Sequence, residues 1–215
     1  MSLIFIFNNI NTFFLVLWGC VAVLVALRYF RPTHVKNISY GWIVALAIFI
    51  HLFYGAFVTG GQYYVWAGGN DFTRSLLHAP LSKEAPLPAF LEWSRSSFEQ
   101  PLGYFVYYVF GRIWLNIIFV FITSGFFYII FRLWSNYRGG FLPHGPELIF
   151  ALLLATGFPG CLILVPLAFT LSFIWFGITF LKKRSMEGVE IHIEPAFIVV
   201  TPMVLLFGKI IRSFF

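Results

Sequence analysis

YGWIVALAIFIHLFYGAFV, residues 40–58, decides the fold class, because these 19 consecutive residues include no charged side chain. At 1.5 Å per residue, a helix of this length spans about 28 Å, close to the thickness of the hydrocarbon core of a lipid bilayer. We therefore predict a transmembrane helix here. Its one strongly polar residue, His51, falls close to the middle of the crossing.

The composition of the whole chain supports the same class. The 215 residues are 60% hydrophobic and 10% charged, with a mean hydropathy of +0.88. A soluble domain carries about 25% charged residues, and a disordered chain combines low hydrophobicity with high charge, so both classes are excluded. The net charge of +6 comes from short basic clusters between apolar runs, which is typical of signals that orient helices. The expected surroundings are a lipid bilayer, with no nucleic-acid partner.

Further apolar runs predict the rest of the bundle. The run from Leu148 to Phe180 has 33 residues and is interrupted by Gly157-Phe158-Pro159-Gly160. Both of its flanks are basic, which requires an even number of crossings. We predict a short leg over 146–156 and a return leg over 161–180, giving a re-entrant or hairpin segment near 146–181. The other predicted crossings are residues 10–27, 104–134 and 195–211.

The sequence thus predicts an all-α fold. We expect a polytopic transmembrane bundle of five to six helices that forms a single membrane domain over residues 1–215. Basic clusters place the loops 28–39, 132–147 and 182–194 in the cytoplasm. The N-terminus and the loop 59–100 then lie on the extracytoplasmic side.

The loop 59–100 is the one sizeable polar segment, and we expect it to form an extracytoplasmic cap with one or two short helices. Asn70 or Asp71 is suited to cap a helix that runs to His78. Asp71, Arg74 and His78 are spaced by three and four residues, so they could meet on one side and bind a polar headgroup. Surface ion pairing and helix capping are the preferred explanation of these residues. Residues 87–100 have the pattern of an amphipathic helix lying on the bilayer.

Two short motifs converge on the predicted cytoplasmic face. His144 and Glu147 stand where the fourth apolar run begins, and residues 190–194 read EIHIE before the last one. In an extended segment Glu190, His192 and Glu194 share one face, a row that suits metal ligation or acid and base roles. His144, His192 and Glu194 are the candidate metal ligands. An alternation that simply follows one wet face explains the second motif as well.

Within the membrane, His51 and Asn116 are the candidate polar residues. They would line a solute path or a proton relay, or they would bond neighbouring helices to one another. No Walker motif, Rossmann fingerprint, nucleophile elbow, His-Glu-x-x-His or Cys-x-x-Cys pattern occurs in the chain, so the sequence leaves the question of a cofactor open.

Three functions follow, in order of preference. The first is a non-enzymatic subunit, scaffold or assembly partner in a membrane system, for which a membrane-protein partner is expected. The second is a membrane-embedded enzyme that acts on a lipid-linked or membrane-inserted substrate through the inner-face His/Glu cluster. The third is a small-solute carrier that uses His51 and Asn116.

Overall fold

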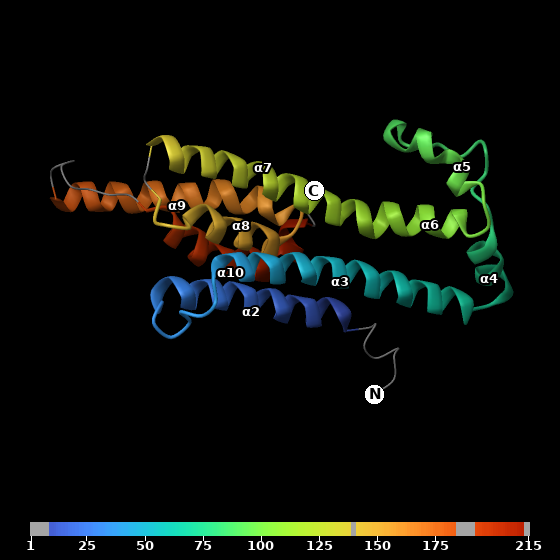
Figure 1. Ribbon diagram of the computed structural model, residues 1–215, viewed down its shortest axis with the longest axis horizontal. Coiled ribbons are helices and arrows are strands. Elements are labelled where there is room, and N and C mark those ends of the chain that lie inside the picture. The colour runs from blue at the N-terminus through green and yellow to red at the C-terminus, as the bar shows by residue number, and fades with distance from the viewer. Residues whose placement is uncertain (1–8, 139–140, 184–191, 213–215) are drawn as a thin grey trace. The chain divides into compact units, whose positions relative to one another are not determined.

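The computed structural model describes residues 9–138, 141–183 and 192–212, and every regular element in these ranges is helical (Figure 1). The all-α prediction is confirmed for this part of the chain. The elements in order are α2 (Ile10–Phe30), α3 (Tyr40–Ala67), α4 (Asp71–His78), the 3-10 helix η1 (Ala89–Ser94), α5 (Arg95–Phe98), α6 (Gly103–Val109), the π-helical turn η2 (Phe110–Trp114), α7 (Leu115–Arg138), α8 (Gly145–Thr156), α9 (Gly160–Lys183) and α10 (Glu194–Arg212).

Four helical stretches are long and apolar enough to cross a membrane: Ile10–Phe30, Tyr40–Ala67, Gly103–Tyr137 and Gly160–Lys182. This number is compatible with an integral membrane protein. Two shorter apolar helices, Gly145–Thr156 and Glu194–Gly208, accompany them. A helix of 12 residues is about 18 Å long, too short to cross alone. A count of five to six crossings, and the side on which each loop lies, therefore stay predictions.

Helix α3 is longer than its sequence predicts, since it has 28 residues and continues to Ala67. The expectation that the polar loop begins at residue 59 is therefore wrong. The Thr59 hydroxyl donates to the carbonyl of Gly55 at 2.7 Å, so this polar side chain is satisfied inside the helix. Near the end of the helix, Tyr63 and Trp66 pack against aromatic rings of α6. At about 42 Å, α3 is as long as a bilayer with its headgroups is thick.

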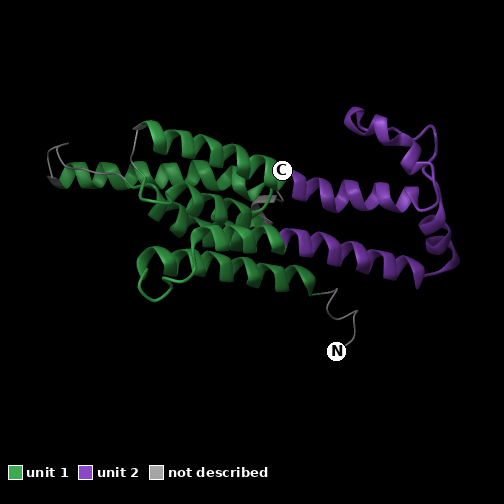
Figure 2. Ribbon diagram, viewed as in Figure 1, with its two compact units in different colours: residues 1–50, 119–215 green, residues 51–118 purple. Residues whose placement is uncertain are grey.

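The chain divides into two compact units (Figure 2). Unit 1 comprises Met1–Ile50 and Phe119–Phe215, and unit 2 comprises His51–Ile118. The boundaries fall inside α3 and α7, so two helices contribute to both units. The single membrane domain predicted over residues 1–215 is not tested by this division.

Unit 1 is built around α8. Ten of its 12 residues are buried, and it packs against α2 and α9 as well as α10. Because other helices surround α8, its sequence is apolar nearly all round and has no distinct polar face. Helix α8 ends at Thr156, Gly157 takes a positive φ of 65°, and α9 begins at Gly160. The predicted break in the fourth apolar run is confirmed, although its depth in a bilayer stays a prediction.

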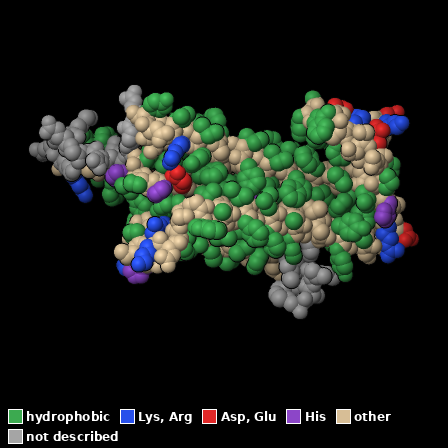
Figure 3. All heavy atoms as spheres, viewed as in Figure 1, with side chains coloured by type: hydrophobic (Ala, Val, Ile, Leu, Met, Phe, Trp, Pro, Cys, Tyr) green, Lys and Arg blue, Asp and Glu red, His purple; other side chains and the backbone are tan. Residues whose placement is uncertain are grey.

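The outer surface of unit 1 matches a lipid environment. Hydrophobic side chains cover the flanks of its helices, and charged and histidine side chains gather at one end (Figure 3). The side chain of Trp175 on α9 is 70% exposed, and those of Trp42 and Phe173 are exposed to a similar fraction. Water would disfavour such large apolar surfaces, whereas lipid tails accept them.

Unit 2 contains residues 68–102, here termed the linking segment, which joins α3 to α6. Asn70 caps α4 by accepting from the Thr73 amide at 2.9 Å, as predicted. Leu81, Leu91 and Phe98 form a small core against α6. The expectation of one amphipathic helix over 87–100 is wrong, because η1 and the single turn α5 occupy this stretch. The carbonyl of Phe98, the last residue of α5, accepts from the Leu81 amide at 2.8 Å.

Gly103 makes the close approach between α5 and α6 possible, which generates a first prediction. A Cβ atom at Gly103 would collide with the backbone carbonyl of Phe98, which cannot move without breaking its bond to Leu81. We expect Gly103→Ala to lower the free energy of unfolding by about 1–3 kcal/mol. Thermal unfolding in detergent and the rate of tryptic cleavage after Lys83 measure the effect.

Gly111→Ala is the matched control, because nothing lies within 4 Å of the added methyl group at that position of η2. It should behave like the natural chain. Equal stability and equal cleavage rates for the two variants would contradict the packing described for the linking segment.

Candidate functional site at the start of α8 and α10

The residues before α8 form a tight turn. The Gly145 amide donates to the carbonyl of Leu142 at 2.8 Å, Pro143 follows Leu142, and His144 has φ 68° and ψ 17°. These features are those of a type II turn, whose third position normally takes glycine. An L residue with a side chain bears about 1–2 kcal/mol of strain in this conformation. Histidine is thus held at the head of α8 at an energetic cost.

The carboxylate of Glu194 lies against this turn. Glu194 is the first residue of α10, it is fully buried, and its Oε1 accepts from the Leu142 amide at 2.8 Å. Gly145 leaves the space that this carboxylate occupies, since a Cβ atom there would collide with Oε1. The partial positive charge at the N-terminus of α10 also favours a carboxylate at this position. The contact joins two helices that begin about 50 residues apart in sequence.

The second oxygen of Glu194 is the unusual feature of the site. Among the described residues, Oε2 of Glu194 is buried and makes no hydrogen bond, and the same holds for Oε2 of Glu147. Glu194 interacts electrostatically with Tyr29 of α2 and Tyr40 of α3. Tyr40 also places its ring 6.4 Å from the His144 ring, between centroids. Buried oxygens without a bond are rare in proteins and mark places where a proton, water or ligand could bind.

Glu147 connects α8 to α7. Its Oε1 accepts from Arg132 Nη1 at 2.8 Å, and the two side chains are 20% and 49% exposed. A partly exposed ion pair contributes little stability, of order 1 kcal/mol or less. Its geometric effect is larger, because it fixes the last turns of α7 beside the first turn of α8.

The structure therefore brings three of the predicted site residues to one place. His144, Glu147 and Glu194 lie around the start of α8, and His192 is half-buried two residues before Glu194. Glu190 lies outside the described residues. Within the described ranges, no three His, Cys, Asp or Glu side chains are grouped so that they could hold a metal ion. Metal ligation by His144, His192 and Glu194 stays a prediction.

Sequence reasoning missed the partners of these residues. The sequence does not indicate that the Glu194 carboxylate packs against Gly145 or that the Leu142 amide donates to it. One signal was present, because Leu-Pro-His-Gly at 142–145 places proline second, where type II turns favour it. The link to Glu194 has no local signal.

The intramembrane pair differs in burial. His51 is buried, whereas Asn116 is exposed on the surface of unit 2. A solute path lined by both residues stays a prediction.

The predicted headgroup site on α4 has the geometry of surface pairing. Arg74 lies 3.7 Å from Asp71, both side chains are well exposed, and Arg74 also donates to the carbonyl of Ala67 at 3.2 Å. His78 is exposed at the end of the helix. Headgroup binding by these three residues stays a prediction.

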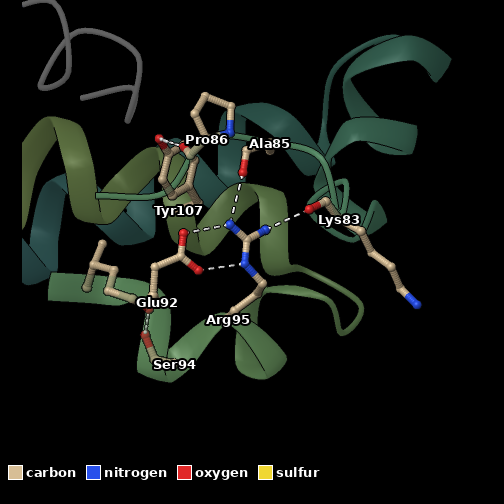
Figure 4. Close-up of polar contacts among 8 residues, drawn as sticks. Lys83, Ala85, Pro86, Glu92, Ser94, Arg95 and Tyr107 are labelled. Atoms are coloured by element: carbon tan, nitrogen blue, oxygen red, sulfur yellow. Dashed lines mark hydrogen bonds and ion pairs between the residues drawn. The ribbon is translucent and has the colours of Figure 1, made fainter. Parts of the chain in front are cut away.

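A second polar arrangement, which sequence reasoning missed, lies in the linking segment (Figure 4). Arg95 donates to both carboxylate oxygens of Glu92 at 2.8 Å, and to the carbonyls of Lys83 and Ala85 at 2.8 and 3.2 Å. The bond from Arg95 lowers the pKa of the Glu92 carboxyl and raises the pKa of the guanidinium. This clamp holds η1 against the chain that precedes it.

The chain matches no protein-family model, and neither a curated protein nor a solved structure shows significant similarity to it.

The contact between Gly145 and Glu194 generates a second prediction. Alanine normally favours a helix over glycine by about 1 kcal/mol. At Gly145 we expect Gly145→Ala instead to lower the free energy of unfolding by about 1–3 kcal/mol, because the methyl group displaces the carboxylate from the Leu142 amide. In a Glu194→Ala background the same change should cost much less. Thermal unfolding of the four proteins gives this coupling.

Gly177→Ala serves as the control, since nothing lies within 4 Å of its added methyl group on α9. It should be neutral or stabilising. Additive effects of Gly145→Ala and Glu194→Ala would mean that the carboxylate does not occupy the space beside Gly145.

The clamp generates a prediction about pH. Because the pKa of Glu92 is lowered on folding, its contribution to stability is complete above the ordinary glutamate pKa and is lost as the pH falls through the lowered value. Tryptic cleavage after Lys83 requires neutral pH, so acid-tolerant pepsin should be used instead. We expect cleavage of the linking segment, measured relative to the cleavage of an unfolded peptide by the same pepsin, to become faster as the pH falls below about 4. Glu92→Gln should remove this step, and an unchanged step in that variant would assign it to another group.

Proposed function

We propose that this protein is a non-enzymatic subunit of a membrane system, acting as a scaffold or assembly partner. One observation carries the proposal: the carboxylates at the start of α8 and α10 connect helices. Glu194 joins α10 to the turn before α8, and Glu147 joins α8 to α7. Side chains used in this way support a rigid bundle whose broad apolar flanks are available to neighbouring membrane proteins.

A specific observation favours a second candidate, the membrane-embedded enzyme. The strained His144 belongs to the turn before α8, and beside this turn lies Oε2 of Glu194, which makes no hydrogen bond within the described part of the chain. An imidazole and a carboxylate are the groups that acid and base catalysis most often uses. This alternative requires the imidazole itself, whereas the scaffold requires only the fold.

Two neighbouring variants separate the candidates. His144→Gly removes the imidazole and relieves the strain of the positive φ, so it should fold at least as well as the natural chain. Gly145→Ala keeps the imidazole and weakens the contact with Glu194. In cells that lack the natural chain, we expect His144→Gly to restore growth and Gly145→Ala to restore it poorly. The degree of rescue should follow the amount of each variant found in the membrane. Loss of rescue by His144→Gly at a normal protein level would contradict the scaffold.

Photo-crosslinking tests for the partner directly. A photoreactive residue is placed at Trp42, Phe126 or Trp175, which are exposed on α3, α7 and α9. A fourth position, Leu154, is fully buried in α8 and serves as the control. The scaffold predicts a discrete protein adduct from at least one exposed position and none from Leu154. Lipid adducts alone at all three exposed positions would count against it.

A further inference from the structure

We propose that the linking segment is a membrane-interface anchor, in which Phe90 and Trp93 of η1 insert between lipid headgroups and acyl chains. The ligand is the lipid surface itself. The inference concerns unit 2 and does not depend on the function proposed for the whole chain.

Phe90 and Trp93 are three residues apart, so they share one side of the 3-10 helix η1, in which Leu91 is the buried residue. Trp93 is 84% exposed and Phe90 is 55% exposed, whereas Leu91 between them is 8% exposed and belongs to the small core. The indole N–H of Trp93 donates to the carbonyl of Phe90 at 2.7 Å. The ring can therefore leave water without losing a hydrogen bond, which removes the main cost of burying tryptophan in lipid.

The linking segment lies at the depth of the interface. Its core packs along α6 and reaches Phe110, the first residue of η2, which lies seven residues and about 10 Å beyond the start of α6. The Tyr107 hydroxyl also donates to the carbonyl of Pro86 at 3.3 Å. The segment therefore folds back beside the first turns of α6 and does not extend away from them.

Helix length locates those first turns. The apolar stretch Gly103–Tyr137 has 35 residues, about 52 Å, which exceeds the hydrocarbon thickness of about 30 Å by some 20 Å. Arg112 and Arg132 are 20 residues apart, about 30 Å along the helix, and mark the two ends of the hydrocarbon layer, so the turns before Arg112 lie among the headgroups. Tyr104, Tyr107 and Tyr108 occur there, as in the aromatic belts of membrane proteins. Arg112 follows, bonded to the Tyr108 hydroxyl at 3.3 Å, with its charge at the same boundary.

The Arg95 clamp gives the anchor its rigidity. Both charges of the Glu92–Arg95 pair are neutralised locally, and the guanidinium also fixes two carbonyls of the preceding chain. A preorganised turn loses less conformational freedom when its rings insert. Interfacial anchors place Trp and Phe on the side that faces lipid and charged residues on other sides.

The test uses the full chain reconstituted in phosphatidylcholine vesicles. The chain has seven tryptophans, so the fluorescence of Trp93 is taken as the difference between the natural protein and Trp93→Phe. That change is at an exposed position and should leave the fold intact. The quenchers are lipids brominated near the headgroup, lipids brominated near the acyl end, and aqueous acrylamide.

We expect the difference emission to be blue-shifted, reduced at least twofold by the shallow bromines, and less affected by the deep bromines or by acrylamide. A red-shifted emission that acrylamide quenches and bromolipid does not would overturn the proposal. The same red-shifted emission is expected if the two rings are instead the docking site of a protein partner, because the vesicles contain no partner protein and the rings would stay in water.

Discussion

Every polar group within a bilayer needs a partner inside the protein, because lipid offers none. Several hydroxyl groups on the described helices meet this demand within their own helix. The hydroxyls of Thr170, Ser172 and Thr201 each donate to the carbonyl four residues earlier, at 2.7 to 2.9 Å. Thr59 does the same on α3. Such bonds let a sequence carry hydroxyl groups through an apolar helix without a second helix to receive them.

The carboxylates cannot be satisfied in this way, and their positions set the arrangement of unit 1. A glutamate at the start of a helix reaches amides that precede another helix, so Glu194 draws the N-terminus of α10 to the turn before α8. Gly145 is required because the approach leaves no room for a side chain. Helix α8 then lies with both its ends fixed, by this turn and by the break at Gly157, and apolar packing covers the rest. The polar contact thus selects one arrangement of helices that apolar packing alone would leave less specified.

The sequence predicted those features that depend on neighbouring residues. The helix from Asp71 to His78 follows from its Asn70 cap, and the break before Gly160 follows from glycine and proline. The end of α3 could not be predicted, because hydropathy falls at Thr59 while the backbone bonds continue. The four bonds of Arg95 were equally hidden, since two of them go to carbonyls 10 and 12 residues away. For the candidate site, residue types were predicted and their partners were not.

The contrast between Glu92 and Glu194 bears on function. Both carboxyl oxygens of Glu92 are used by one guanidinium, so this residue is a structural element of the linking segment. Glu194 uses one oxygen for the Leu142 amide and keeps the other buried without a bond within the described residues. An unmet oxygen of this kind costs about 1–3 kcal/mol, and the strain at His144 adds to that cost. A purely structural contact would be stronger with both costs removed, for instance with glycine at position 144. The packing of α8 against α2, α9 and α10 must offset both costs, so the helices around the turn hold it in place and its own conformation does not.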